Sequence, residues 1–169
     1  MGSLTGKKVF ITGAEQGIGK ETARKLIEAE CDIYIHYFSG EEGPRELIAI
    51  AQQRGAKAAC GYADLTNEAD AARCVAEGAA FLGGIDILVN NVGGIIARKW
   101  LGEIDPQFWR TVIDVNMTTM LNVTQSALPL LKEATDGASI VNLASLAGRS
   151  GGHSGSLVYS MTKGAVLTW

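Results

Sequence analysis

Short apolar runs alternate along the chain with longer stretches of helical periodicity. A run that is apolar through its centre, such as "GGIDILVNN", is typical of a parallel strand covered on both faces. The longer stretches repeat apolar residues three and four positions apart, as Phe108, Val112 and Val115 do. The expected strands are Lys8–Thr12, Asp32–Tyr37, Ala56–Tyr62, Ile85–Asn90 and Ser139–Ser145, and the expected helices are Gly17–Glu30, Pro44–Arg54, Glu68–Leu82 and Pro106–Glu133.

This alternation predicts right-handed βαβ crossovers and a doubly wound parallel sheet in three α/β/α layers, a Rossmann-like architecture. No linker or repeat interrupts the pattern, so residues 1–169 are expected to form a single domain. A doubly wound sheet has about six strands, whereas five are visible here. The closing stretch "YSMTKGAVLTW" begins a helix whose apolar face has hardly started. We therefore expect the chain to be truncated at its C-terminus.

Composition narrows the possible functions. The chain has 47% hydrophobic and 20% charged residues, which is typical of a globular protein, and its net charge of -3 gives no basic footprint for nucleic acid. No apolar run approaches the ~20 residues of a membrane span, and "MGSLTGKK" lacks a signal-peptide core. Cys31, Cys60 and Cys74 form no CxxC pair, which predicts buried reduced thiols and a cytoplasmic location.

The stretch "TGAEQGIG" puts Gly13, Gly17 and Gly19 between an expected strand and an expected helix. Such a turn lets the backbone approach a pyrophosphate, which the following helix N-terminus attracts. Gly13 would form the turn, Gly17 would admit the pyrophosphate, and Gly19 would let the helix pack closely. A lysine-bearing P-loop fails, because five residues separate the outer glycines and Glu21 stands where a hydroxyl is needed. A glycine turn without a ligand is the alternative.

Tyr159 and Lys163 are four residues apart, so on a helix they share one face. A nearby ammonium lowers the pKa of a phenol from its ordinary value of ~10, which makes the pair a sensible acid–base device. An accidental surface pair is the alternative. A Ser-His hydrolase is disfavoured, because "GGHSGS" only approaches the G-x-S-x-G elbow. His36 and His153 show no spacing for a triad or a metal site, so we expect surface histidines and no metal.

Five motifs together resemble the classical short-chain dehydrogenase/reductase family. They are "TGAEQGIG", "NNVGG", Asn116 in "DVNMT", Ser145 in "VNLASLAG" and "YSMTK". The resemblance runs from about residue 6 to the end of the chain, in the order of the family, and its nearest members are 3-oxoacyl-thioester reductases and sugar dehydrogenases. It implies an NAD(P)(H)-dependent oxidoreductase that interconverts a carbonyl and a secondary alcohol.

The resemblance also implies roles for four residues. Tyr159 would exchange a proton with the substrate oxygen, and Lys163 would hold the nicotinamide ribose and tune Tyr159. Ser145 would bind the substrate oxygen, while Asn116 would unsettle its helix and hold a water of a proton relay. Ser145 and Tyr159 are one residue further apart than is usual in the family, so the loop between them is expected to be slightly extended.

The second expected strand decides the cofactor prediction. An NAD enzyme usually ends this strand with an acid that binds the adenosine ribose, and Tyr37 stands here instead. Without a carboxylate a 2′-phosphate is not repelled, so NADP(H) is favoured over NAD(H). His36 or Ser39 could contact that phosphate, although the usual arginine is missing.

The rest of the cofactor site is carried over from the resemblance. Asp64 in "ADLT" matches the acid that contacts adenine, an N-capping role being the alternative. Asn90 and Gly93 would support the adenine–ribose side, with Val92 in place of the usual alanine. The predicted cofactor-binding set is Gly13, Gln16, Gly17, Ile18, Gly19, His36, Tyr37, Ser39, Asp64, Leu65, Asn90, Val92, Gly93, Tyr159 and Lys163.

The expected partners are a small carbonyl or alcohol substrate and copies of the chain itself. The resemblance implies a homodimer or homotetramer formed through Pro106–Glu133 and the helix begun at Tyr159. It also implies that a C-terminal substrate lid and further strands are missing. Trp100, Trp109 and residues 146–158 are candidates to line the substrate site, although core packing explains the tryptophans equally well. The alternative function is a non-catalytic NADP-sensing protein on the same fold, which has no need of the acid–base pair.

Overall fold

A computed structural model describes residues 4–169, so the first three residues of the predicted single domain lie outside it. Five parallel strands form one sheet in the order β3-β2-β1-β4-β5. The order steps outward from β1 to β3 and then crosses to the other side of β1, which creates a switch point between β1 and β4. The strands are β1 Lys8–Ile11, β2 Asp32–Tyr37, β3 Ala58–Tyr62, β4 Ile87–Asn90 and β5 Ser139–Asn142.

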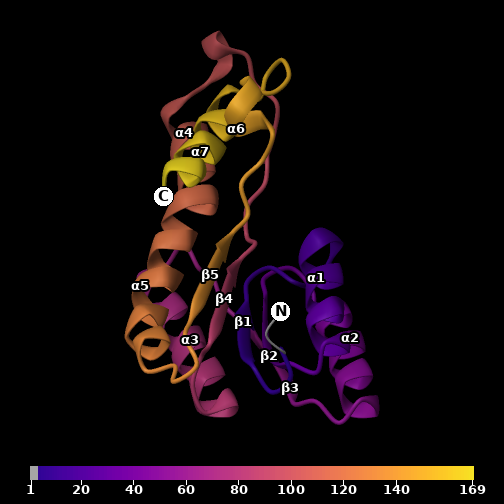
Figure 1. Ribbon diagram of the computed structural model, residues 1–169. Coiled ribbons are helices and arrows are strands. Elements are labelled where there is room, and N and C mark those ends of the chain that lie inside the picture. The colour runs from indigo at the N-terminus through magenta and orange to yellow at the C-terminus, as the bar shows by residue number, and fades with distance from the viewer. Residues whose placement is uncertain (1–3) are drawn as a thin grey trace.

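Helices cover both faces of the sheet (Figure 1). Ile11 and Ile33 pack with α1 and α2 on one face, and Phe10 and Leu88 pack with α3 and α5 on the other. The predicted three-layer doubly wound fold is therefore confirmed. The helices are α1 Gly17–Glu28, α2 Glu42–Gln53, α3 Glu68–Leu82, α4 Pro106–Ile113, α5 Thr119–Lys132, α6 Ala147–Ser150 and α7 Leu157–Thr168.

Two expected elements differ clearly from the structure, whereas the bounds of the others agree with it to within two residues. The helix predicted over Pro106–Glu133 is interrupted by a π-helical segment, Asp114–Thr118, between α4 and α5. The last strand ends at Asn142 rather than Ser145, so residues 143–145 are left as a loop at the carboxyl end of the sheet. A short 3₁₀ helix at Leu101–Glu103 and the single turn α6 were not expected from the sequence.

Polar side chains cap the N-termini of α3 and α4. Asn67 caps α3 by accepting a hydrogen bond from the amide of Asp70 at 3.0 Å. Asp105 caps α4 in the same way, and Pro106 occupies the first turn. Among residues 4–169, no helix is both long and apolar enough to cross a bilayer. The same part of the chain holds no cluster of three or more histidine, cysteine or acidic side chains that could bind a metal ion.

Candidate functional site

A cavity of about 650 Å³ lies along the carboxyl ends of the strands. Its wall runs from the glycine-rich loop, past the ends of β2, β3 and β4, to α7. Ligands in open α/β sheets bind at this edge. Eleven of the predicted cofactor residues line the cavity: Gly13, Gln16, Ile18, Gly19, His36, Asp64, Leu65, Val92, Gly93, Tyr159 and Lys163.

The glycine-rich loop is held against the end of β4. Asn91 Nδ2 donates to the carbonyls of Thr12 at 3.0 Å and Gly13 at 2.7 Å. Thr12 Oγ1 in turn accepts from the amides of Asn91 at 2.9 Å and Val92 at 3.1 Å. A Cβ on Gly17 would meet nothing within 4 Å, so the loop is open on that side. These contacts fix the backbone where a phosphate would approach.

Asn91 was missed by sequence reasoning, which chose Asn90 from the same "NNVGG" motif. The side chain of Asn90 is buried, and its Nδ2 donates to Thr124 Oγ1 at 3.0 Å and to Asn142 Oδ1 at 2.8 Å. It therefore braces β4 against β5 and α5 and does not line the cavity. Neighbouring side chains at a strand end point to opposite faces, which is why only one asparagine reaches the loop.

His36 is buried, with 1% of its surface exposed, so the expectation of a surface histidine is wrong for this residue. Its Nδ1 accepts from the amide of Gly13 at 3.0 Å, and its Nε2 lies 2.9 Å from the carbonyl of Ala63. This pairing requires the neutral tautomer that carries its proton on Nε2. Burial also lowers the pKa of His36, so the ring ties the glycine loop to β2 and β3 without a positive charge.

Tyr37 and Ser39 stand outside the cavity wall. Tyr37 ends β2 and packs edge-on against Tyr62, with ring centroids 6.1 Å apart. Ser39 follows in an exposed loop, where its hydroxyl donates to Glu15 Oε1 at 3.1 Å.

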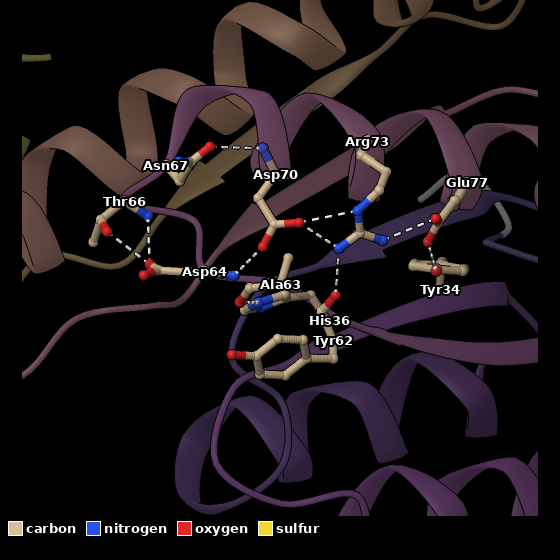
Figure 2. A network of polar contacts seen from close by, with 10 residues as sticks. All are labelled: Tyr34, His36, Tyr62, Ala63, Asp64, Thr66, Asn67, Asp70, Arg73 and Glu77. Atoms are coloured by element: carbon tan, nitrogen blue, oxygen red, sulfur yellow. Dashed lines mark hydrogen bonds and ion pairs between the residues drawn. The ribbon is translucent and has the colours of Figure 1, made fainter.

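Asp64 follows β3 and is held by the network shown in Figure 2. Its Oδ1 accepts from the amide and the hydroxyl of Thr66 at 3.0 and 2.7 Å. Its own amide donates to Asp70 Oδ2 at 2.6 Å, and hydrogen bonding from Arg73 keeps the pKa of Asp70 below its ordinary value. The N-cap of α3 is Asn67, so the alternative reading of Asp64 as that cap does not hold.

Lys163 lies where α7 forms the cavity wall, which we call the inner end of the cavity. It is buried, with 3% of its surface exposed. Its Nζ donates to the carbonyl of Leu143 at 2.7 Å and lies 6.0 Å from the ring centroid of Tyr159. Burial lowers the pKa of Lys163. A Cβ on Gly93 would come within 2.9 Å of Nζ and 2.8 Å of Asn116 Oδ1. Glycine at position 93 therefore leaves room for both side chains beside the backbone.

Asn116 lies in the π-helical segment Asp114–Thr118 and is buried. Its Nδ2 donates to the carbonyls of Val112 and Gly94, both at 2.9 Å, and its Oδ1 accepts from the amide of Gly94 at 3.0 Å. The side chain thus fastens the loop after β4 to the widened helical turn. Single π-turns of this kind are frequent at functional sites.

Ser145 lines a second cavity, of about 250 Å³, together with Arg98 and His153. Its Oγ accepts from the amide of Ala147 at 3.2 Å, which leaves its own proton available to another acceptor. Tyr159 lines both cavities and therefore stands between them. Arg98 was not predicted from the sequence, because the segment "IIARKW" shows neither helical nor strand periodicity that would place it in this wall. Trp100 and Trp109 line neither of these two cavities, whereas residues from 146–158 line the smaller one.

Comparison with known proteins settles the family. The profile of the family described as "short chain dehydrogenase" matches residues 7–169. The chain belongs to the short-chain dehydrogenase family. A tetrahydroxynaphthalene reductase of Pyricularia oryzae is 28% identical over 167 residues, which cover 99% of this chain and 58% of that protein. A 3-oxoacyl-[acyl-carrier-protein] reductase of Staphylococcus aureus is 29% identical, over 95% of this chain and 64% of its own length.

Two solved structures superpose closely on the chain. An NADH-dependent reductase, A1-R′, solved in complex with NAD, has a TM-score of 0.91 and 31% identity, over 96% of this chain and 69% of that one. A Burkholderia cenocepacia short-chain dehydrogenase in complex with NADP has a TM-score of 0.91 and 27% identity, over 99% of this chain and 67% of that one. Relatives thus bind NAD or NADP. The chain spans about three fifths of the length of the curated relatives named above.

Proposed function

We propose that the chain carries the dinucleotide site and the acid–base residues of an NAD(P)(H)-dependent oxidoreductase that interconverts a carbonyl and a secondary alcohol. One observation carries this proposal: a single cavity joins the glycine-rich loop to Tyr159 and Lys163. A glycine turn that merely connected a strand to a helix would not need to open toward a tyrosine and a buried lysine.

The residues of the cavity fit a nicotinamide dinucleotide. The first turn of α1 contains no acidic side chain, so its positive dipole end favours phosphate beside the open flank of Gly17. Asp64 offers a carboxylate at the outer part of the wall, and Lys163 offers the ammonium at the inner end. When bound, the nicotinamide would donate or accept a hydride at its C4 atom.

Proton transfer falls to Tyr159, because its side chain borders both cavities. The ammonium of Lys163 lies 6.0 Å from the ring centroid of Tyr159, one helical turn along the same face of α7, so the two side chains can act on the same bound group. Ser145, whose Oγ already accepts from Ala147, would donate its proton to the substrate oxygen. Asn116 would hold the inner end of the site in register through Gly94 and support a water on the proton path to Lys163.

The test compares wild type with Tyr159→Phe in the protein extended to the full length of its relatives. General acid–base catalysis contributes about 10²–10⁴-fold, so turnover should fall by that factor while affinity for the dinucleotide stays within about threefold. A panel of ketones and aldehydes with NADH and NADPH supplies the substrates. Equal turnover by the two proteins would refute the role of Tyr159. Binding without any turnover by wild type would favour the non-catalytic sensor instead.

The short chain itself is expected to bind the dinucleotide. Its turnover should be lower than that of a protein of the relatives' full length, because the chain spans only about three fifths of the curated relatives named above. A homodimer or homotetramer would form through α4, α5 and α7. Trp109 on α4 and Leu121 and Leu128 on α5 are exposed and could contribute to this contact. A cytoplasmic location and a small-molecule substrate complete this proposal. The preference for NADP(H) that Tyr37 suggests rests only on a missing acid at the end of β2.

A further inference from the structure

An acid does stand beside the end of β2, but it comes from the glycine-rich loop. Glu15 lines the large cavity, and its Oε1 accepts a hydrogen bond from Ser39 Oγ at 3.1 Å. Ser39 lies two residues beyond the end of β2. A Cβ on Gly43 of α2 would come within 2.9 Å of the carbonyl carbon of Glu15, so α2 packs tightly on the Glu15 backbone. Ser39 thus holds the carboxylate of Glu15, and α2 holds its backbone.

The second carboxylate oxygen of Glu15 is buried and lacks a partner. Among the described residues 4–169, no group donates a hydrogen bond to Oε2. A buried, unpaired carboxylate oxygen is costly, and such atoms in folded proteins normally have a partner. In a cavity that accepts a dinucleotide, the hydroxyls of the adenosine ribose are neutral donors that suit it. A 2′-phosphate would replace one of those donors with a second anion.

The charges around this end of the cavity do not compensate for a 2′-phosphate. Within the described chain, Lys163 is the only lysine or arginine in the cavity wall, and it lies at the opposite, nicotinamide end. Cations of the neighbouring helices are engaged elsewhere: Lys20 pairs with Glu46 at 2.7 Å, and Arg45 pairs with Glu41 at 2.8 Å. His36 is neutral and uses both ring nitrogens on the backbone.

We propose that Glu15 is the residue that selects NAD(H) over NADP(H), by accepting a hydrogen bond from the adenosine ribose through Oε2. It replaces the acid that NAD enzymes usually carry at the end of the second strand. This inference rests on the proposed function, since it assumes that the large cavity binds a dinucleotide. It also reverses the cofactor preference inferred from Tyr37, because a carboxylate reaches the same region from a different segment.

The test measures binding rather than turnover. Isothermal titration calorimetry with NADH and with NADPH is carried out on wild type, Glu15→Gln and Glu21→Gln. Glutamine keeps the size of Glu15 and an oxygen for Ser39, but removes the charge. Glu21, an exposed residue of α1 that pairs with Arg24 at 3.2 Å, controls for a general change of net charge.

Wild type and Glu21→Gln should bind NADH at least about tenfold more tightly than NADPH, which corresponds to ~1.4 kcal/mol. Glu15→Gln should bring the two affinities within about threefold, with tighter NADPH binding and unchanged thermal stability. Wild-type preference for NADPH, or the same affinity ratio in Glu15→Gln as in wild type, would overturn the role of Glu15. Failure of wild type to bind either dinucleotide would overturn the proposed function as well.

Discussion

Replacing Gly19 with alanine would force apart the two segments that form the phosphate end of the cavity. A Cβ at this position would lie 2.5 Å from the carbonyl oxygen of Gly13 and 3.0 Å from Ala14 Cα, and it would also collide with Asn91 Nδ2. Two of these three atoms are backbone atoms, which cannot rotate away. The Asn91 amide cannot withdraw without losing its hydrogen bonds to the carbonyls of Thr12 and Gly13.

The expected loss of stability follows from these contacts. Overpacking costs about 1–3 kcal/mol, and each broken neutral hydrogen bond adds roughly 1 kcal/mol. The better helix propensity of alanine returns at most ~1 kcal/mol. Gly19→Ala should therefore lower the free energy of unfolding by about 2–4 kcal/mol, which for a chain of this size lowers Tm by roughly 5–15 °C.

Urea and thermal unfolding followed by circular dichroism measure this loss. Gly40→Ala is the matched control, because a Cβ at Gly40 would meet nothing within 4 Å and the residue has no left-handed φ. That variant should stay within about 0.5 kcal/mol of wild type. If Gly19→Ala were as stable as Gly40→Ala, the close packing of α1 on the strand ends would not be what shapes this loop.

Two further predictions concern the supports of the site. His36 binds a proton less readily in the folded chain than in the unfolded one, so stability should be complete above its ordinary pKa of ~6.5 and decline as the pH falls below it. Urea unfolding between pH 7.5 and 5.5 should show a steeper decline in wild type than in His36→Gln, and equal slopes would contradict this cause. Asp70→Ala should lower stability by about 1.5–3 kcal/mol, because Asp64 and Arg73 lose a charged hydrogen-bond partner. It should also weaken NADH binding several-fold, whereas Glu68→Ala, an exposed change on the same helix, should do neither.

The sheet was predictable from the sequence because its determinants are local. Apolar runs that alternate with segments of helical periodicity indicate parallel strands joined by helices. The right-handedness of βαβ units then limits the possible topologies of the sheet. The shared face of Tyr159 and Lys163 was predictable for the same reason, because residues four positions apart on a helix lie on the same face. Strand ends were harder to place: the expected strand over residues 139–145 ends at Asn142, three residues early.

The remaining site residues depend on contacts between distant segments, which local patterns do not reveal. Nothing in "NNVGG" shows which asparagine turns toward the glycine loop, and the sequence favoured Asn90 over Asn91. No residue close to His36 in the sequence indicates that its two ring nitrogens bind the backbone of Gly13 and Ala63. Glu15 lies within the glycine-rich motif, yet its hydrogen bond with Ser39 requires β2 to lie beside β1.

The central claim is that the cavity along the strand ends binds a nicotinamide dinucleotide. Titration of the 169-residue chain with NADH, followed by the fluorescence of the reduced nicotinamide, tests this claim most directly. Saturable binding at one site per chain, reversed by an excess of NAD⁺, is the predicted result. A signal that does not saturate, or that an excess of NAD⁺ leaves unchanged, would contradict the account.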